Sequence, residues 1–286
     1  MLKHEIFLIE TLTNTHMGSG DVSFGMVDNL IQKDPVTFLP VFHPSSLKGA
    51  IREHMEQYVP TELSRENIQQ IFGNEKDEFE NEGNKPGKVK FYEARLLTLP
   101  LRATKKVYYH CTSPSVILEY LDAIETFCGD GEAENLKCVI KGLNFDGIEF
   151  SIFENETDLE VEDYIRYNEV EIEAGKEKLI KKYLDVDIRN LAIFNDDIFK
   201  EICEGSIPVV ARNKIGEDGT SENLFYEEVL PRRSKLWFML GFDENETINP
   251  KFKERLTSDI IQFGANASIG YGVSKIKLVV GGVKNE

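Results

Sequence analysis

The sequence predicts an α+β domain in which helices cover one face of an antiparallel sheet. Strand-like and helix-like patterns alternate along the 286 residues, with no internal repeat and no long linker between them. The hydrophobic fraction of 41% is enough for one large core. We therefore expect residues 1–286 to form a single domain, and a ferredoxin-like or RRM-like core is one layout that fits this order.

The first expected strand carries the clearest evidence for the sheet. In His4–Thr13, Ile6 and Leu8 point to one face while Phe7 and Ile9 point to the other. A strand that is apolar on both faces suits the centre of a covered sheet.

Helix signals and strand signals account for most of the remaining chain. Pro44 opens a helix that Ser45 or Ser46 can cap, with Leu47 and Ile51 on its apolar face. The other predicted helices cover 62–72, 116–127, 176–184, 196–203 and 250–263, and the other predicted strands cover 36–42, 88–101, parts of 138–173, 236–242 and 274–280.

Three segments have a different pattern. Residues 15–34 are glycine-punctuated and form a predicted loop, and the polar, acidic residues 74–87 form a predicted mobile loop. Val209–Ile215 and Asn223–Leu230 flank a turn-rich stretch and are typical of a hairpin, which we expect over about 207–231.

The net charge of −17 argues against a generic nucleic-acid binder, but the charge is unevenly distributed. Residues 74–82 hold five acids and one lysine, and residues 154–173 hold nine acids and one arginine. In contrast, residues 85–107 contain one acid, Glu93, and seven basic residues: Lys85, Lys88, Lys90, Arg95, Arg102, Lys105 and Lys106. A phosphate responds to charge within about 8 Å at physiological salt, so a local basic surface is compatible with the acidic total.

Nothing in the sequence predicts export or a membrane. No apolar run is long enough to span a bilayer, and Lys3, His4 and Glu5 stand where a signal peptide would be apolar. The four cysteines form no CxxC pair, so we expect reduced, mostly buried thiols. The expected location is the cytoplasm, without membrane contact.

The loop at 13–29 is the first segment whose residues could take part in a reaction. It places His16 and Asp28 twelve residues apart among glycines. An aspartate can accept a proton from a ribose 2′-hydroxyl or hold a divalent cation, and an imidazole can hold a phosphate or move a proton. Taken alone, a turn-capping aspartate and a surface histidine explain the segment better.

The helix start at 44–52 and the glycine-rich segment 264–272 are the second and third candidates. Two serines at a helix N-terminus, followed by Lys48 and Arg52, suit a phosphate. The small residues of 264–272 allow a protein or nucleic-acid backbone to approach closely. Each segment alone is more typical of an ordinary capped helix or a tight loop. Walker, GxSxG, HExxH and EF-hand patterns are absent from the sequence.

Together and in this order, the segments resemble the RAMP superfamily of CRISPR proteins, and within it the repeated backbone subunits of type III-B (Cmr) effector complexes. The matching pieces span nearly the whole chain: 16–20 (HMGSG), 27–33 (VDNLIQK), 45–52 (SSLKGAIR), 94–102 (ARLLTLPLR), 224–231 (LFYEEVLP) and 264–272 (GANASIGYG). The resemblance implies a modified RRM-like core, or palm, with an inserted finger region and the 207–231 hairpin as a thumb.

The resemblance also implies an activity and partners. The partners would be a guide crRNA, target single-stranded RNA, other copies of the chain in a helical stack and other Cmr subunits. The activity would be endoribonuclease cleavage of the target at regular intervals, dependent on Mg²⁺ or Mn²⁺, in which a target 2′-hydroxyl attacks and a cyclic phosphate is left.

Residue roles follow from the same resemblance. Asp28 matches the catalytic, metal-holding aspartate, and His16 and Glu227 match further positions of the site, although Glu228 is a neighbour that the pattern does not separate from Glu227. The RNA-binding residues would be Gly18, Ser19, Ser45, Ser46, Lys48, Arg52, Gly270, Tyr271 and Gly272.

Three other functions remain open at this point. The chain could be a non-catalytic scaffold of the same complex, a superfamily member that processes precursor guide RNA with a histidine, or an unrelated ferredoxin-like protein. The presence of Asp28 favours the enzyme over the scaffold, and the order of the motifs argues against the other two.

Overall fold

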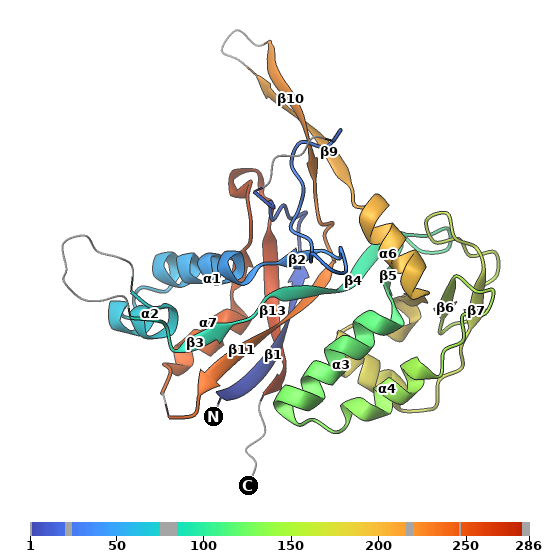
Figure 1. Ribbon diagram of the computed structural model, residues 1–286, viewed down its shortest axis with the longest axis horizontal. Coiled ribbons are helices and arrows are strands. Elements are labelled where there is room, and N and C mark those ends of the chain that lie inside the picture. The colour runs from blue at the N-terminus through green and yellow to red at the C-terminus, as the bar shows by residue number, and fades with distance from the viewer. Residues whose placement is uncertain (1, 21–24, 75–84, 216–219, 246, 282–286) are drawn as a thin grey trace.

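A large mixed sheet forms the centre of the computed structural model, which describes residues 2–20, 25–74, 85–215, 220–245 and 247–281 (Figure 1). Its strands follow the order β12-β13-β1-β11-β4-β5-β8-β6-β7, with β2 paired to β4 and β3 paired to β11. Their bounds are β1 (Leu2–Thr11), β2 (Val41–Phe42), β3 (Val89–Phe91), β4 (Ala94–Arg102), β5 (Tyr108–Thr112), β6 (Phe150–Ile152), β7 (Tyr167–Glu169), β8 (Leu191–Phe194), β11 (Lys235–Asp243), β12 (Ile260–Gln262) and β13 (Val273–Gly281).

The helices complete the predicted α+β class, which is confirmed. They are α1 (Pro44–Tyr58), α2 (Arg65–Phe72), α3 (Pro114–Cys128), α4 (Ala133–Lys141), α5 (Lys176–Leu184), α6 (Asp196–Gly205) and α7 (Pro250–Ser258). The sequence predicted an antiparallel sheet, but the sheet is mixed. Strand β5 pairs with β8 in parallel, and β6 pairs with β7 in parallel. Among the described residues, no helix is long and apolar enough to cross a membrane.

Helices lie on both faces of the sheet, whereas the sequence predicted them on one. In the β1–β11 pairing, Leu8 lies opposite Trp237, and the Trp237 ring lies 5.4 Å from the ring of Tyr120 on α3. The other face carries Phe242, whose ring centroid lies 4.1 Å from the Lys253 ammonium on α7. This double cover explains why the C-terminal part of β1 and nearly all of β11 are buried.

Helix α1 begins differently from the prediction. His43 is its N-cap residue and makes no side-chain cap bond, while Ser45 and Ser46 lie in the first turn. The predicted cap was therefore wrong, because Pro44 already occupies the first helical position, where a missing N–H costs nothing.

Three other boundaries also differ. The strand expected over 36–42 is reduced to Val41–Phe42, because the Asp34 carboxylate accepts the backbone N–H groups of Val36 and Thr37 and forms a turn. The helix expected to reach residue 263 ends at Ser258, and Ile260–Gln262 pairs with β13 instead. In 138–173, where strands were predicted, α4 continues to Lys141 and only the short β6 and β7 are extended.

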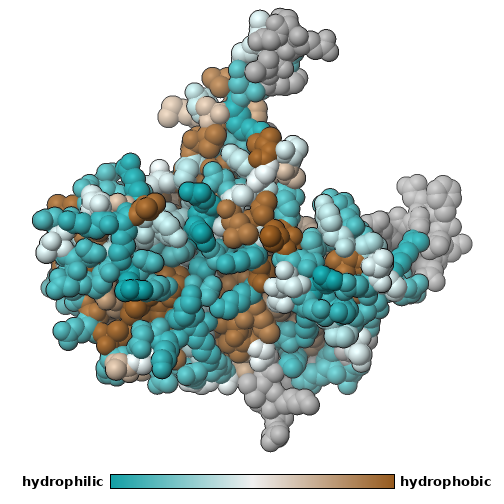
Figure 2. All heavy atoms as spheres, turned by 180° about the vertical axis from the view of Figure 1, so that it is seen from behind, coloured by the Kyte–Doolittle hydropathy of each residue, from teal (hydrophilic) through white to brown (hydrophobic). Residues whose placement is uncertain are grey.

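The predicted thumb hairpin is confirmed as β9 (Val209–Ile215) paired with β10 (Ser221–Glu228), and it projects from the body (Figure 1). Hydrophobic and hydrophilic groups are mixed on the surface of the projection (Figure 2). Its strands include Val209, Leu224 and Tyr226, which are 45%, 55% and 41% exposed. The hairpin tip at 216–219 and most of the predicted mobile loop, 75–84, lie outside the described residues.

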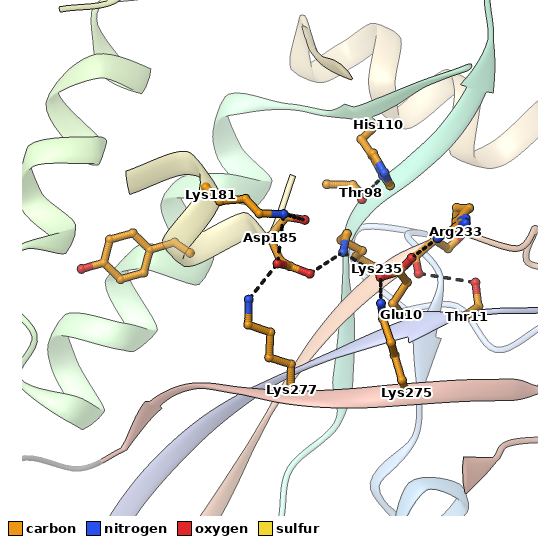
Figure 3. Close-up of polar contacts among 12 residues, drawn as sticks. Glu10, Thr11, Thr98, His110, Lys181, Asp185, Arg233, Lys235, Lys275 and Lys277 are labelled. Atoms are coloured by element: carbon orange, nitrogen blue, oxygen red, sulfur yellow. Dashed lines mark hydrogen bonds and ion pairs between the residues drawn. The ribbon is translucent and has the colours of Figure 1, made fainter. Parts of the chain in front are cut away.

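Ion pairs join three central strands to the end of α5 (Figure 3). We call this set the sheet-face cluster: Glu10, Asp185, Arg233, Lys235, Lys275 and Lys277. Lys235, which is 3% exposed, bridges the two carboxylates at 3.1 Å from Glu10 and 3.2 Å from Asp185.

Candidate functional site

Four polar side chains from distant parts of the chain meet where the hairpin joins the body. We call them the hairpin-base cluster: His16, Arg212, Glu227 and Asn266. Glu227 is 4% exposed, and its carboxylate accepts a hydrogen bond from Arg212 Nη1 at 3.1 Å. Asn266 Nδ2 lies 3.1 and 3.0 Å from the two carboxylate oxygens. A buried carboxylate is thereby charge-paired and hydrogen-bonded, as burial requires.

The imidazole of His16 lies against the same carboxylate. His16 Nδ1 is 2.7 Å from the backbone oxygen of Glu228, and Nε2 is 3.6 Å from Glu227 Oε1. Because a carbonyl only accepts, Nδ1 carries a proton. Nε2 is therefore the ring nitrogen that faces the Glu227 carboxylate.

Two glycines make room for His16. At Gly264, which has φ +79°, a Cβ would lie 2.3 Å from the His16 carbonyl oxygen. At Gly18, a Cβ would lie 3.0 Å from His16 Nε2. The N-terminal loop and the glycine-rich segment therefore approach each other. The sequence left open whether a protein or a nucleic-acid backbone approaches 264–272, and at Gly264 it is the backbone of the protein itself.

Asp28 is exposed and lies along β10, beside this cluster. Its Oδ2 accepts a hydrogen bond from the backbone N–H of Tyr226 at 2.7 Å, and its own N–H donates to the Tyr226 oxygen at 3.0 Å. Asp28 is thus hydrogen-bonded to Tyr226, the residue that precedes Glu227 in β10. Among the described contacts, none joins the Asp28 side chain to His16 or Glu227.

The structure separates Glu227 from Glu228, which the sequence pattern could not do. Glu228 Oε2 accepts from the backbone N–H of Ile31 at 3.1 Å, and Oε1 lies 3.2 Å from Lys33 Nζ. Glu228 therefore holds the segment that follows Asp28, while Glu227 belongs to the cluster around His16.

The described residues contain no group of three or more His, Cys, Asp or Glu side chains that could hold a metal ion. Asp28 offers one exposed carboxylate with one oxygen engaged by the Tyr226 N–H. Such a donor fits Mg²⁺ or Mn²⁺, because these ions are often held by one protein carboxylate and take their other ligands from water and phosphate oxygens.

A basic groove lies at the start of α1. Its volume is 750 Å³, and its lining includes Ser45, Lys48, Arg52, Lys85 and Lys90. No Asp or Glu is among the described residues that line it. Burial and the positive charges of Arg52 and Lys90 lower the pKa of Lys48. Lys85 and Lys90 belong to the basic run in the sequence, so the fold adds them to the predicted Lys48 and Arg52.

Gln32 connects this helix start to the N-terminal loop. Its Nε2 lies 3.0 Å from the Gly18 carbonyl oxygen and 3.0 Å from Ser46 Oγ, while its Oε1 accepts from the His43 N–H at 2.7 Å. The predicted RNA-binding residues Gly18 and Ser46 are therefore joined through one side chain. Sequence reasoning assigned no role to Gln32, because a single buried glutamine carries no local signal.

The glycine-rich segment contributes to the hairpin base. At Gly272, which has φ +78°, a Cβ would lie 1.9 Å from the Phe263 oxygen, whereas a Cβ at Gly270 would meet nothing within 4 Å. The Tyr271 ring centroid lies 5.9 Å from the Arg212 guanidinium carbon. Tyr271 and Gly272 therefore support the hairpin-base cluster, and Gly270 keeps open space beside it.

Three other members of the basic run form ion pairs within the chain. Arg95 lies 2.7 Å from Glu93, Arg102 lies 2.8 Å from Glu162, and Lys106 pairs with Glu154. Part of the acidic stretch 154–173 thus faces basic residues of the same chain. In the groove, Arg52 is also paired, with Glu56 at 2.8 Å.

Comparisons with known proteins agree with this geometry. The family model of the RAMP superfamily matches residues 8–275. The endoribonuclease Cmr4 of the CRISPR Cmr system from Pyrococcus furiosus is 27% identical over 284 residues, covering 94% of this chain and 93% of the relative.

Solved structures show the same fold. A chain of the type III-B Cmr-beta complex superposes with a TM-score of 0.75 in the apo state at 20% identity, covering 96% of this chain and 97% of the other. The same complex bound to cognate target RNA gives a TM-score of 0.72 at 20% identity, with the same coverage. Oligomeric Cmr4 from Pyrococcus furiosus gives 0.68 at 22% identity, covering 100% of both chains. The resemblance predicted from the motifs is confirmed, and this chain belongs to the RAMP superfamily.

Proposed function

We propose that this chain is a backbone subunit of a type III-B Cmr complex that binds guide crRNA and cleaves complementary target RNA. The observation that carries the cleavage proposal is the hydrogen bond from the backbone N–H of Tyr226 in β10 to the Asp28 carboxylate. The next residue of the strand is Glu227, whose carboxylate lies 3.6 Å from His16 Nε2. A relative named as an endoribonuclease and solved complexes with target RNA support the same assignment.

RNA backbone binding is assigned to the basic groove and the loop beside it. Lys48, Arg52, Lys85 and Lys90 supply positive charge, and the first turn of α1 supplies backbone N–H groups that suit phosphate. Contacts to phosphates do not depend on the RNA sequence, so base pairing between guide and target would supply the specificity. Copies of the chain and other Cmr subunits would complete the path of the RNA, in keeping with the oligomeric relative.

The proposed reaction is attack of a target 2′-hydroxyl on its neighbouring phosphorus. The new O–P bond forms as the bond from phosphorus to the 5′-oxygen breaks, which leaves a 2′,3′-cyclic phosphate and a 5′-hydroxyl. In this proposal Asp28 would receive the 2′-hydroxyl proton, and His16 Nε2 would give or take a proton at the hairpin base. The projecting hairpin would hold the strand with its 2′-oxygen in line with the leaving oxygen, which is the larger contribution.

A divalent cation fits this site through Asp28, and it would supply charge stabilisation at the phosphate oxygens. The chain offers one carboxylate for it, so the ion would take its other ligands from water and RNA.

The test is cleavage of a guide-complementary RNA by the assembled complex, with Asp28→Asn beside wild type. Asparagine keeps an oxygen that can accept the Tyr226 N–H, so the loop stays docked while the charge is lost. Asp34→Asn is the matched control, because Asp34 also caps backbone N–H groups in a nearby turn. Addition of EDTA followed by Mg²⁺ or Mn²⁺ tests the cation in the same assay.

Regular cuts by wild type and by Asp34→Asn, with normal target binding but no cuts by Asp28→Asn, support the proposal. Equal cutting by all three complexes would reduce this chain to a scaffold subunit. Target binding that fails for the wild-type complex would overturn the RNA-binding assignment itself.

A further inference from the structure

A second cavity adjoins the basic groove on the α3 side of the sheet. Its volume is 520 Å³, and its apolar lining includes Phe91, Phe127, Trp237 and Met239. Tyr92 lines both this cavity and the groove, as do Phe91 and Pro44. We call it the aromatic pocket. An occupant can therefore reach from the groove into the pocket without leaving the surface.

The polar part of the pocket lining carries three carboxylates, each paired with a cation, beside Arg95 and Thr126. Glu93 and Glu119 both pair with Arg95, the first at 2.7 Å. Asp122 pairs with Lys137 at 2.6 Å. These pairs offset part of the negative charge of the rim, because Arg95 serves two carboxylates and Lys137 is shared with Glu125 and Glu134. The carboxylates keep lone pairs that can accept from a ligand that donates hydrogen bonds.

The two neighbouring cavities together define a chemical class of ligand. The groove is lined by four cations, of which Arg52 is also paired with Glu56, and the pocket is lined by aromatic side chains with carboxylate acceptors at its edge. An anionic backbone carrying a flat, apolar group whose edge bears N–H donors satisfies both. Single-stranded RNA has this construction, and its bases commonly stack on aromatic side chains.

We propose that the aromatic pocket receives an unpaired nucleobase of an RNA strand whose backbone lies in the basic groove. The inference rests on the proposed RNA binding and adds a base-holding site to it. The carboxylate rim favours a base with two adjacent donors, since a carboxylate can accept both at once. Guanine has such a pair in its N1–H and its 2-amino group, whereas uracil has one N–H and no amine.

Trp237 provides a direct probe of the pocket, because it is the only tryptophan of the chain and lines the pocket. The full chain is titrated with a uridine hexanucleotide and with the same hexanucleotide carrying one central guanosine. Tryptophan emission reports the pocket, and anisotropy of labelled RNA reports total binding. We expect a saturable emission change with the guanosine RNA and about tenfold weaker binding of the all-uridine RNA.

Three variants separate the pocket from the groove. Ala123→Phe fills the pocket and is expected to abolish both the emission change and the guanosine preference. Glu119→Gln leaves the volume intact and is expected to weaken the guanosine preference, so the test remains decisive if the first variant misfolds. Tyr58→Ala is the control, because Tyr58 is 73% exposed and does not line the pocket.

The outcomes distinguish the two proposals. If wild type binds both RNAs alike, or if Ala123→Phe and Glu119→Gln keep the preference, the pocket proposal is wrong while RNA binding stands. An emission change that follows protein concentration without RNA would assign the pocket to a second copy and also overturn it. If neither wild type nor Lys48→Ala binds RNA, alone or in the assembled complex, the proposed RNA binding is itself wrong. The pocket proposal, which rests on it, then falls as well.

Discussion

The sheet-face cluster and the hairpin-base cluster both surround buried carboxylates, but they are assembled in different ways. In the sheet-face cluster, the strand register places Lys235 and Lys275 directly opposite Glu10 on its two neighbouring strands. In the hairpin-base cluster, Glu227 is reached by Asn266 and His16 from loops far away in the sequence. The first cluster is part of the hydrogen-bonded sheet, and the second exists only if several loops dock correctly.

This difference indicates what each cluster contributes. Burial raises the pKa of Glu10, but the charge of Lys235 and hydrogen bonds from Arg233, Lys275 and Lys235 outweigh it and lower the pKa to about 2. The sheet-face cluster therefore stabilises the fold in its charged form. The hairpin-base cluster holds a projecting hairpin against two loops, so its loss should move reacting groups with little effect on the core.

The largest expected effect is on stability, from Lys235→Met. This change leaves the Glu10 and Asp185 carboxylates without their buried bridging cation, which should cost about 3–5 kcal/mol of unfolding free energy in urea denaturation. Lys277→Met removes a half-exposed partner of the same Asp185 and should cost no more than about 1 kcal/mol. Equal losses in the two variants would contradict the structural role of the buried lysine.

A smaller effect is expected on cleavage, from Glu227→Gln. The glutamine amide would direct an N–H group at Arg212 or Asn266, both of which donate to this position, so the hairpin base should shift. We expect target cleavage by the assembled complex to fall about 10- to 100-fold, with RNA affinity and thermal stability nearly unchanged. Glu222→Gln, an exposed change on the same strand, is the control. A loss of stability as large as that of Lys235→Met would show that the two clusters do not differ in kind.

The smallest expected effect is a change in the pH dependence of stability. The pKa of Glu10 is about 2 in the folded chain and ordinarily 4.5, so its contribution is complete above pH 4.5 and is lost as the pH falls toward 2. Urea midpoints measured between pH 7 and pH 3 should therefore fall less steeply below pH 4.5 in Glu10→Gln than in wild type. Parallel curves would indicate that Glu10 is not charge-paired in the folded chain.

Local signals predicted several elements well. The helix at Lys176–Leu184 and the strand at Val209–Ile215 have the expected bounds. The end of α7 and the 138–173 region were predicted wrongly. In both regions, residues far away in the sequence decide whether the chain is a strand or a helix, and the local pattern does not contain them. Ile260–Gln262, for example, is a strand because it pairs with β13.

The functional residues show the same division. Motif order placed His16 and Glu227 in one candidate site, and the structure brings their side chains together. Arg212, Asn266 and Gln32 were not identified, because an arginine in a hairpin, an asparagine in a loop and a buried glutamine acquire their roles only from partners that lie far away in the sequence.

The sequence by itself determined the α+β class, the projecting hairpin and the order of motifs that places the chain in the RAMP superfamily, because these depend on periodicity and spacing along the chain. Only the tertiary structure decided where the charges of the basic run lie. It paired Arg102 and Lys106 with the acidic stretch and brought Lys85 and Lys90 into the lining of the groove beside Lys48. Charge acts over a few ångströms in space, so a net charge summed along the sequence could not distinguish these two outcomes.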